Sequence, residues 1–260
     1  MNGFDPRPAA EALRAARQAR AGVAPLDAAI APRDEAEGYA AQHALARLHG
    51  AVPPAGFKIG ATAKRMQDYL GLSGPAAGFM EAASLRPSGT VIDCARHVAP
   101  GVECEIAVRL AHDLPAGPTT QTAAEAAVGE VFAAIELVEN RYADLRALGT
   151  PTLIADQVFH AAAILGPPLA GWRGVDLGAV QGRLTVNGAL RDSGHGRDLL
   201  GHPMAALAWL AGSQAASVFG GLRAGQVVML GSVTPPAWLD GPAEVTVSFD
   251  GFAPVTVTLR

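Results

Sequence analysis

The chain has 260 residues, of which 50% are hydrophobic and 17% are charged, and its formal net charge at pH 7 is −4. This composition is typical of a folded globular protein, gives no basic surface for nucleic acid, and includes too few cysteines for a disulfide framework or a zinc cluster. The first twenty residues carry Asp5 and several arginines, and no apolar run of ~18 residues follows, so we expect neither a signal peptide nor a membrane span, and a cytoplasmic protein.

The N-terminal segment is predicted to be helical. Alanine and arginine dominate residues 7–22, which favours one helix, and Asp34 can cap a second helix that runs to Leu48. We therefore predict a single catalytic domain, 1–260, in which residues 1–50 form a helical layer and residues 51–260 form a β-rich body.

A lysine lies in the middle of the next predicted strand, GFKIG, at Gly56–Gly60. Most lysines extend into solvent, and Lys58 could do the same. The glycines around it permit close approach of a ligand, however, so Lys58 could also place a cation against a carboxylate or a carbonyl.

A helix is expected from Thr62 to about Leu70, and the following segment is predicted as a loop. Residues Gly71–Ser88 are rich in glycine, proline and serine, with Phe79 and Met80 as an apolar tip. Loops of this length often act as lids or binding loops.

Two glutamates share one face of the next predicted strand, GVECEIAVRL, at Gly101–Leu110. Because side chains alternate along a strand, Glu103 and Glu105 lie ~6.5–7 Å apart on one side, and Cys104 points to the other. Two such carboxylates repel each other unless something neutralises them, and a hard divalent cation such as Mg²⁺ would do so. The commoner alternative is that both glutamates lie on a solvated face with Cys104 in the core.

A third acid interrupts an otherwise apolar run, Val131–Val138, which is predicted as a buried strand after a helix that begins near Thr122. Burial of Glu136 is costly unless the carboxylate is paired or binds a metal. Glu139 and Arg141 follow the run and could form an ion pair on the surface.

Asp156 and His160 precede another apolar strand. His160 is expected to be a satisfied, partly buried histidine, whereas Asp156 could be a turn residue or a site carboxylate. A helix from Pro203 to about Phe219 follows, and the C-terminal half is otherwise mostly strands, without regular βαβ alternation. The predicted strands there are Leu184–Val186, Ala189–Asp192, Gln226–Gly231, Ala243–Phe249 and Val255–Leu259.

The segments GFKIG, VECEI, AIELVENR, SGHG with LLGHP, and LRAGQVVMLGS occur in this order along the chain. Together they resemble the 2-oxopent-4-enoate hydratase and 4-oxalocrotonate decarboxylase group of the fumarylacetoacetate hydrolase superfamily. The resemblance extends over essentially the whole chain. It implies an α+β fold, a mixed β-sandwich or roll of the fumarylacetoacetate hydrolase C-terminal type with N-terminal and peripheral helices, usually assembled into homo-oligomers.

The resemblance also implies a set of site residues. The metal-binding acids of the family match Glu103, Glu105 and Glu136, which would hold Mg²⁺ or Mn²⁺. The active-site lysine of the G-[YF]-K-[IV]-G motif matches Lys58, and the acid of the A-D-N-A-S stretch matches Asp156, a candidate general acid or base. The chain departs from the family in two places where substrate contacts are anticipated. One is Phe159, at the position of a small serine, and the other is GSVTPP at 231–236.

The implied activity is that of a hydro-lyase in meta-cleavage aromatic catabolism, which adds water to a small 2-hydroxy-dienoate or 2-oxo-enoic acid and gives a 4-hydroxy-2-oxo acid. Two alternatives use the same metal, namely decarboxylation of the 4-oxalocrotonate type and C–C hydrolysis of an acylpyruvate. A third alternative is a non-catalytic partner subunit that keeps the fold. The expected partner is a small 2-oxo acid rather than nucleic acid or membrane, and the family admits a complex with another enzyme of the pathway.

Overall fold

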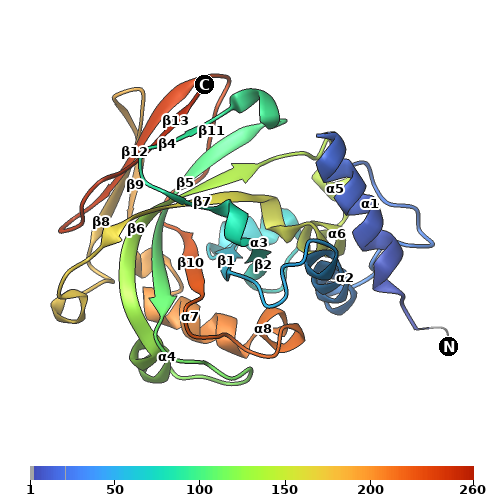
Figure 1. Ribbon diagram of the computed structural model, residues 1–260, viewed down its shortest axis with the longest axis horizontal. Helices are drawn as coiled ribbons and strands as arrows, with labels where there is room; N and C mark the ends of the chain where they lie inside the picture. Colours follow the sequence, from blue (N-terminus) through green and yellow to red (C-terminus); the bar gives the residue numbers. More distant parts are fainter. Residues whose placement is uncertain (1–2, 21) are drawn as a thin grey trace.

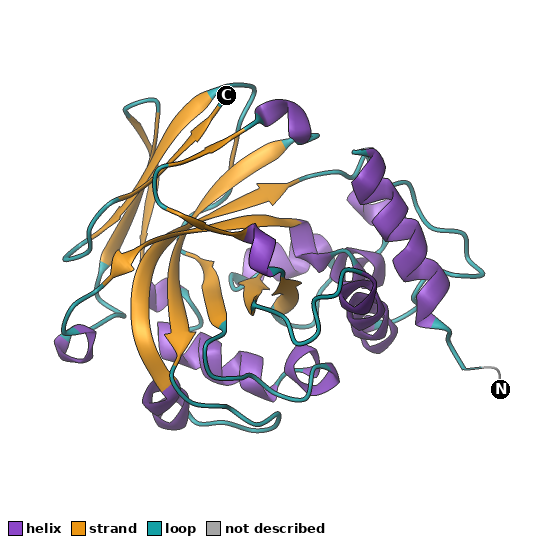
Figure 2. Cartoon of the chain, in the orientation of Figure 1, coloured by secondary structure: helices purple, strands orange, loops and turns teal. Residues whose placement is uncertain are grey.

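The computed structural model describes residues 3–20 and 22–260, and it shows two β-sheets flanked by helices (Figures 1 and 2). The strands of the larger sheet, in spatial order, are β2 (Ala76–Met80), β1 (Gly56–Gly60), β10 (Val227–Ser232), β5 (Pro100–Leu110), β6 (Val128–Glu139), β7 (His160–Pro168) and β3 (Leu85–Pro87), with β11 (Ala237–Trp238) paired to β5. The strands of the second sheet are β4 (Thr90–Ile92), β13 (Val255–Leu259), β12 (Ala243–Phe249), β8 (Gln181–Val186) and β9 (Ala189–His195). The predicted α+β fold class is therefore confirmed.

Helices gather at one end of the molecule and below the larger sheet (Figure 1). The α-helices are α1 (Pro6–Ala19), α2 (Glu35–Leu48), α3 (Lys64–Leu70), α4 (Gln121–Ala127), α5 (Leu145–Leu148), α6 (Thr150–Ala155), α7 (Pro203–Gly212) and α8 (Gln214–Val218). The single-turn 3₁₀ helices are η1 (Ala82–Ser84), η2 (Cys94–Arg96), η3 (Gln157–Phe159), η4 (Trp172–Gly174) and η5 (Gly196–Asp198). In the described ranges, no helix combines the length and the hydropathy that crossing a bilayer requires.

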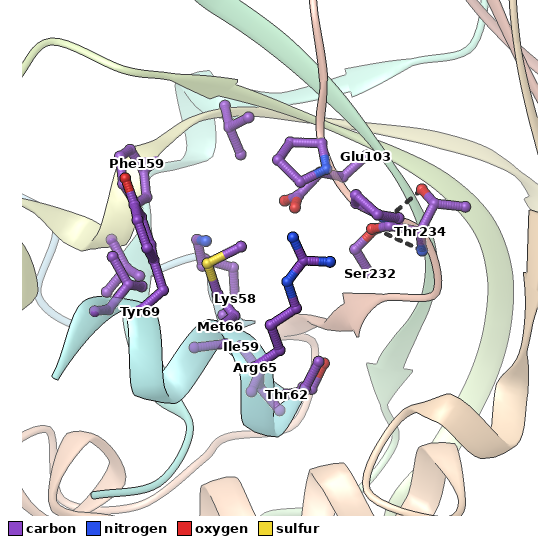
Figure 3. A pocket seen from close by; sticks show the side chains of 18 of the residues that line it. Lys58, Ile59, Thr62, Arg65, Met66, Tyr69, Glu103, Phe159, Ser232 and Thr234 are labelled. Atoms are coloured by element: carbon purple, nitrogen blue, oxygen red, sulfur yellow. Dashed lines mark hydrogen bonds between the residues drawn. The ribbon is translucent and has the colours of Figure 1, made fainter. Parts of the chain in front are cut away.

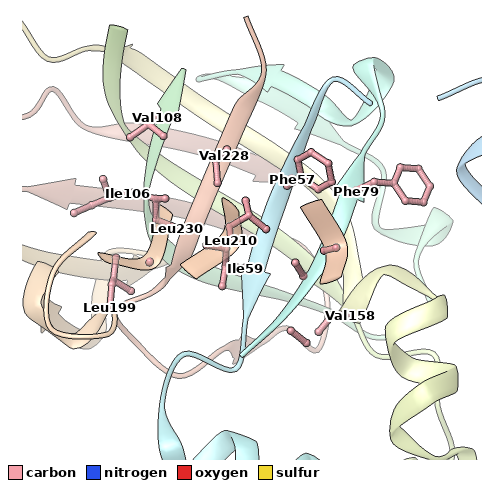
Figure 4. Packing of buried hydrophobic residues seen from close by; sticks show 14 of the residues in the cluster. Phe57, Ile59, Phe79, Ile106, Val108, Val158, Leu199, Leu210, Val228 and Leu230 are labelled. Carbon is pink, nitrogen blue, oxygen red and sulfur yellow. The ribbon is translucent and has the colours of Figure 1, made fainter. Parts of the chain in front are cut away.

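Strand alternation gives the larger sheet one face that packs in the main hydrophobic core and an opposite face that carries both acidic side chains and a smaller hydrophobic cluster. Side chains from β1, β5 and β10 fill the main hydrophobic core on one face, and Leu210 of α7 belongs to the same cluster (Figure 4). Cys104 is fully buried in this core, as predicted, which places Glu103 and Glu105 on the opposite face of β5. Phe57 and Ile59 flank Lys58 in the same way on β1.

The predicted N-terminal helices pack against the body of the protein. The Asp34 side chain caps α2, as expected, and α2 packs against both α1 and α6. Gly38 allows the close approach to α6, because a Cβ atom there would lie 2.7 Å from the carbonyl oxygen of Pro151. The buried Gln42 side chain donates hydrogen bonds to the carbonyl oxygens of Ala77 and Ile154, and so joins α2 to the sheet and to α6.

Three local predictions were wrong. The segment 71–88 is not a loop: it forms β2, η1 and β3, and Phe79 and Met80 are fully buried in β2, which pairs with β1. The helix predicted from Pro203 is interrupted at Ser213, whose hydroxyl accepts a hydrogen bond from the backbone and caps α8. Arg141 is only 5% exposed and pairs with Asp156, not with Glu139 on the surface.

Candidate active site

Three glutamates converge on the face of the larger sheet opposite the main core. The antiparallel register of β5 and β6 places Glu103 directly opposite Glu136, and Glu105 follows two residues along the same face of β5. Each of the three offers one carboxylate oxygen, and these oxygens all lie within 4.8 Å of one another. The structure thus brings together all three acids that the sequence singled out.

Two buried oxygens of this cluster lack hydrogen bonds within the described residues. Glu105 and Glu136 are fully buried, and neither Oε1 of Glu105 nor Oε2 of Glu136 makes a hydrogen bond within the described residues. Oε2 of Glu136 does lie 3.3 Å from the ammonium group of Lys58, but without hydrogen-bond geometry. Buried carboxylate oxygens without partners are costly, and oxygen ligands of this kind suit a divalent cation. The residues present therefore fit a metal ion.

Burial and mutual repulsion shift the pKa values of the three glutamates in different directions. Burial, reinforced by the charge of Glu136, raises the pKa of Glu103 to about 8. Burial also raises the pKa of Glu105 well above its usual range, and the charges of Glu136 and Glu103 add to this effect. Burial opposes the charge of Glu136 too, but Lys58 and a hydrogen bond with His160 outweigh it and lower the pKa of Glu136. A bound divalent cation would offset this repulsion and favour the ionised form of all three carboxylates.

Lys58 lies beside these acids, as the sequence predicted. It occupies the middle of β1 and is only 2% exposed. Burial works against its charge, yet the pKa of Lys58 is raised because Glu136, Glu103 and Glu105 surround it. Lys58 is therefore a buried, charged ammonium group held at the carboxylate cluster.

His160 fixes the orientation of Glu136. Its Nδ1 atom lies 2.8 Å from Oε1 of Glu136, and its Nε2 atom lies 3.1 Å from the hydroxyl of Ser84. Both ring nitrogens are thus satisfied, in agreement with the sequence-based expectation of a structural histidine. Partners of this type hold a ligand carboxylate in a fixed orientation.

An irregularity in β10 brings backbone to the cluster. The register of β10 against β5 shifts between Met229 and Ser232, and the amide of Gly231 donates a hydrogen bond of 3.1 Å to Oε2 of Glu105. Gly231 has a φ of 105°, and a Cβ atom there would lie 2.6 Å from Thr62. Only glycine suits this position, because the backbone conformation and the space both exclude a side chain.

A cavity of about 650 Å³ opens onto this cluster (Figure 3). Lys58 and Glu103 line it, together with Ser232 at the end of β10 and Thr234 just after it. Figure 3 shows Glu103, Ser232 and Thr234 on one side and Tyr69 and Phe159 on the other. The cavity also has lining residues that the sequence did not single out, among them Arg65, Met66, Tyr69, Asn140, Leu145 and Trp238. Asn140 lies within the AIELVENR motif, which assigns it no role, and the others come from short segments outside the motifs that only the fold brings together.

Asp156 is not among the residues that line the cavity, in contrast to its predicted role as a general acid or base there. Its Oδ1 atom accepts a hydrogen bond of 2.7 Å from Nε of Arg17, and its Oδ2 atom accepts from Arg141 and from the hydroxyl of Tyr142. Burial opposes its charge, but the two arginines and the tyrosine outweigh this and lower the pKa of Asp156. A fully occupied, ionised carboxylate favours a structural role for Asp156 over proton transfer.

The network around Asp156 supports a strained turn. Three consecutive non-glycine residues have positive φ, with 62° at Gln157, 50° at Val158 and 68° at Phe159. The left-handed conformation costs roughly 1–2 kcal/mol per L-residue, so this turn needs support from its surroundings. Arg17 donates to the carbonyl oxygen of Asp156 (2.7 Å), and the Gln157 side chain donates to that of Phe79 (2.9 Å). These bonds hold Val158 and Phe159 in the cavity wall.

The chain is similar to known proteins over most of its length. A sequence model described as the fumarylacetoacetate (FAA) hydrolase C-terminal family matches residues 56–260. A protein of Paraburkholderia phymatum named 2-keto-4-pentenoate hydratase is 32% identical over 247 residues, which cover 94% of this chain and 93% of the relative. A Pseudomonas putida protein named 4-oxalocrotonate decarboxylase is 29% identical over 202 residues, covering 77% of this chain and 75% of the relative.

A solved structure has the same fold over nearly its whole length. It is a 4-oxalocrotonate decarboxylase from Pseudomonas putida G7, complexed with magnesium and adipate, and it superposes with a TM-score of 0.90. The alignment covers 98% of this chain and 97% of that chain at 24% sequence identity. This likeness places the two sheets and the peripheral helices in a known architecture.

Proposed function

Because the chain belongs to the fumarylacetoacetate hydrolase family, we propose that it is a hydro-lyase that adds water to a 2-hydroxy-dienoate or 2-oxo-enoic acid and gives a 4-hydroxy-2-oxo acid. The near full-length identity of 32% with a 2-keto-4-pentenoate hydratase supports this reaction. The observation that carries the proposal is the convergence of three carboxylates, two of them with orphan oxygens, beside a buried lysine at the end of a cavity.

Glu103, Glu105 and Glu136 would hold a divalent cation, for which we propose Mg²⁺ or Mn²⁺. Such an ion would supply Lewis-acid stabilisation of the negative charge that develops on the 2-oxo oxygen. His160 and the Gly231 amide keep Glu136 and Glu105 oriented through their hydrogen bonds. This support resembles the outer hydrogen-bonding shell found around metal ligands in general.

Lys58 would bind the substrate carboxylate or donate the proton that the substrate carbon takes up. Hydration of a dienol requires that a proton leaves the 2-hydroxyl group, that a carbon is protonated, and that water adds at the position conjugated with the carbonyl. The ammonium of Lys58 lines the cavity, so it can bind a carboxylate or donate a proton to substrate there. Its burial excludes bulk water from this exchange.

The proposed reaction is tested directly with purified, Mg²⁺-loaded protein. We expect it to consume 2-hydroxypenta-2,4-dienoate and form 4-hydroxy-2-oxopentanoate, with loss of activity in EDTA and recovery on addition of Mg²⁺ or Mn²⁺. Release of carbon dioxide from 4-oxalocrotonate without hydration would identify a decarboxylase, and cleavage of an acylpyruvate would identify a C–C hydrolase. A folded, metal-binding protein that turns over none of these acids would contradict an enzymatic function and identify a partner subunit.

Replacement of Lys58 with methionine is expected to lower kcat by about a hundredfold or more while Mg²⁺ binding persists, because the substitution removes a proton donor and no carboxylate. Metal binding is measured by calorimetry and turnover by loss of the dienoate absorbance. Lys64→Met is the matched control, since Lys64 lies exposed on α3 and pairs with Asp68 outside the cavity. Unchanged kcat in Lys58→Met would remove Lys58 from the mechanism.

A further inference from the structure

The two ends of the cavity differ in chemistry. Lys58, Glu103, Ser232 and Thr234 provide the polar end, next to the carboxylate cluster. Apolar side chains form much of the remaining lining, and Figure 3 shows two of them, Tyr69 and Phe159, together across the cavity from Glu103. The apolar wall is defined here by Met66, Tyr69, Val138, Leu145, Phe159 and Trp238.

Three aromatic side chains in this apolar wall come from separate segments. Tyr69 belongs to α3, Phe159 to η3 and Trp238 to β11. The rings of Phe159 and Trp238 lie 6.5 Å apart between centroids, in an edge-to-face arrangement. Tyr69 remains 63% exposed and Trp238 47% exposed. Large aromatic side chains that stay accessible around one cavity are typical of a surface that a ligand covers.

The backbone conformation also fixes the positions of Phe159 and Trp238 in this wall. Phe159 ends the strained turn 157–159, and the Asp156 network holds that turn from behind the cavity. Trp238 packs over Gly101, where a Cβ atom would lie 2.7 Å from its ring. Backbone strain persists only where the surrounding structure holds it, and strained residues are common at ligand-binding and active sites.

Charge is confined to the other end. Among the described residues that line the cavity, the cationic ones are Lys58 and Arg65. The ammonium group of Lys58 lies 3.3 Å from Oε2 of Glu136, and Figure 3 shows the guanidinium group of Arg65 directed toward Glu103 and Ser232. The acidic lining residues are Glu103 and Asp198. A second carboxylate lying against the apolar wall would lose its hydration without gaining a cation, which is unfavourable. The wall therefore favours an uncharged group.

We propose that the apolar wall is a subsite for a bulky, uncharged tail, so that the preferred substrates are 2-oxo monocarboxylic acids with an aromatic or branched apolar substituent at the end remote from the carboxylate. The inference rests on the proposed function, which puts the 2-oxo acid group at the carboxylate cluster. The cavity volume of about 650 Å³ agrees with this, because a short pentenoate bound at the polar end would leave the side chains of Tyr69, Phe159 and Trp238 in contact with water.

Binding of acids that cannot react tests the subsite. With Mg²⁺-loaded protein in a calorimeter, 2-oxo-5-phenylpentanoate is expected to bind at least about tenfold tighter than 2-oxopentanoate, which corresponds to ~1.4 kcal/mol. The dicarboxylic acid 2-oxoadipate is expected to bind no tighter than 2-oxopentanoate. Equal affinities for the phenyl and the short acid, or tighter binding of the dicarboxylic acid, would overturn the proposal, and so would the absence of binding by all three.

Substitutions in the apolar wall test whether its side chains cause the preference for the phenyl-substituted acid. Tyr69→Ala and Phe159→Ala are each expected to weaken binding of the phenyl acid by about threefold to tenfold, and to weaken 2-oxopentanoate less. Tyr69 lies exposed on α3, so its truncation keeps the test valid even where Phe159→Ala fails to fold. Lys64→Ala on the same helix is the control and should change neither affinity. A phenyl preference that survives both wall substitutions would refute the subsite, whereas failure of the hydratase assay alone would leave this binding order standing.

Discussion

Replacement of Glu105 with glutamine is expected to stabilise the metal-free protein at pH 7 and, at the same time, to remove its stabilisation by Mg²⁺. Glu105 is fully buried next to Glu103 and Glu136, and one of its oxygens has no hydrogen-bond partner in the described structure. A neutral amide relieves the repulsion, can still accept the hydrogen bond from the Gly231 amide, and can donate one to a neighbouring carboxylate.

The pH dependence fixes the sign of this effect. Burial raises the pKa of Glu105 in the folded protein well above its usual value of 4.5. A group with a raised folded pKa contributes stability that is complete below the unfolded pKa and is lost as the pH rises toward the folded pKa. The wild type should therefore lose stability between pH 4.5 and neutrality in EDTA, and Glu105→Gln should lose less. Thermal unfolding in EDTA at pH 5 and pH 7 measures the difference.

Although Glu105→Gln should be more stable than the wild type without metal, it should bind Mg²⁺ more weakly. A ligand at a hundred times its Kd stabilises a protein by about 2.7 kcal/mol, so Mg²⁺ should raise the Tm of the wild type clearly and that of Glu105→Gln little. We expect kcat/KM to fall by at least about a hundredfold, or ~2.7 kcal/mol. Glu130→Gln, on the same strand as Glu136 but half exposed and paired with Arg109, is the control for an uncharged substitution. Unaltered Mg²⁺ affinity in Glu105→Gln would contradict the assignment of Glu105 as a ligand.

Features that depend on a single strand, such as which side chains share a face and which are buried, were predictable from the sequence. Alternation along β5 predicts that Glu103 and Glu105 share a face and that Cys104 is buried, and the isolation of Glu136 in an apolar run predicts its burial. The position of Glu136 opposite Glu103 depends on the register between β5 and β6, which no local pattern specifies. The family resemblance supplied that juxtaposition.

Longer-range relations were not predictable in this way. Arg17 and Asp156 are 139 residues apart, and nothing in the alanine-rich N-terminal helix distinguishes Arg17 from its neighbouring arginines. The small residues of β2 have weak strand propensity, so the segment resembled a loop, yet pairing with β1 makes it a buried strand. Tertiary contacts override local propensity in both cases.

Replacement of Asp156 with asparagine is expected to destabilise the protein by about 3–5 kcal/mol, because the hydrogen bonds of its carboxylate favour a structural role. The substitution leaves Arg141, which is 5% exposed, as an uncompensated buried charge, and it weakens the bond from Arg17. Urea unfolding at pH 7 in the presence of Mg²⁺ measures the loss. The control is Asp250→Asn, which breaks an ion pair with Arg183 whose side chains are 40% and 56% exposed, and should cost no more than about 1 kcal/mol.

The pH profile and the activity of the variant separate the two roles considered for Asp156. The pKa of Asp156 is lowered below its usual value of 3.8, so the carboxylate contributes stability above that pH and loses it as the pH falls toward the folded pKa. Asp156→Asn should lack this acid-sensitive increment and, because the turn 157–159 loses its support, should also bind the phenyl-substituted acid less tightly. A general acid or base would behave differently: its asparagine variant would keep the stability of the wild type and lose turnover. Full stability combined with loss of kcat would therefore restore the catalytic role that the motif alone implied.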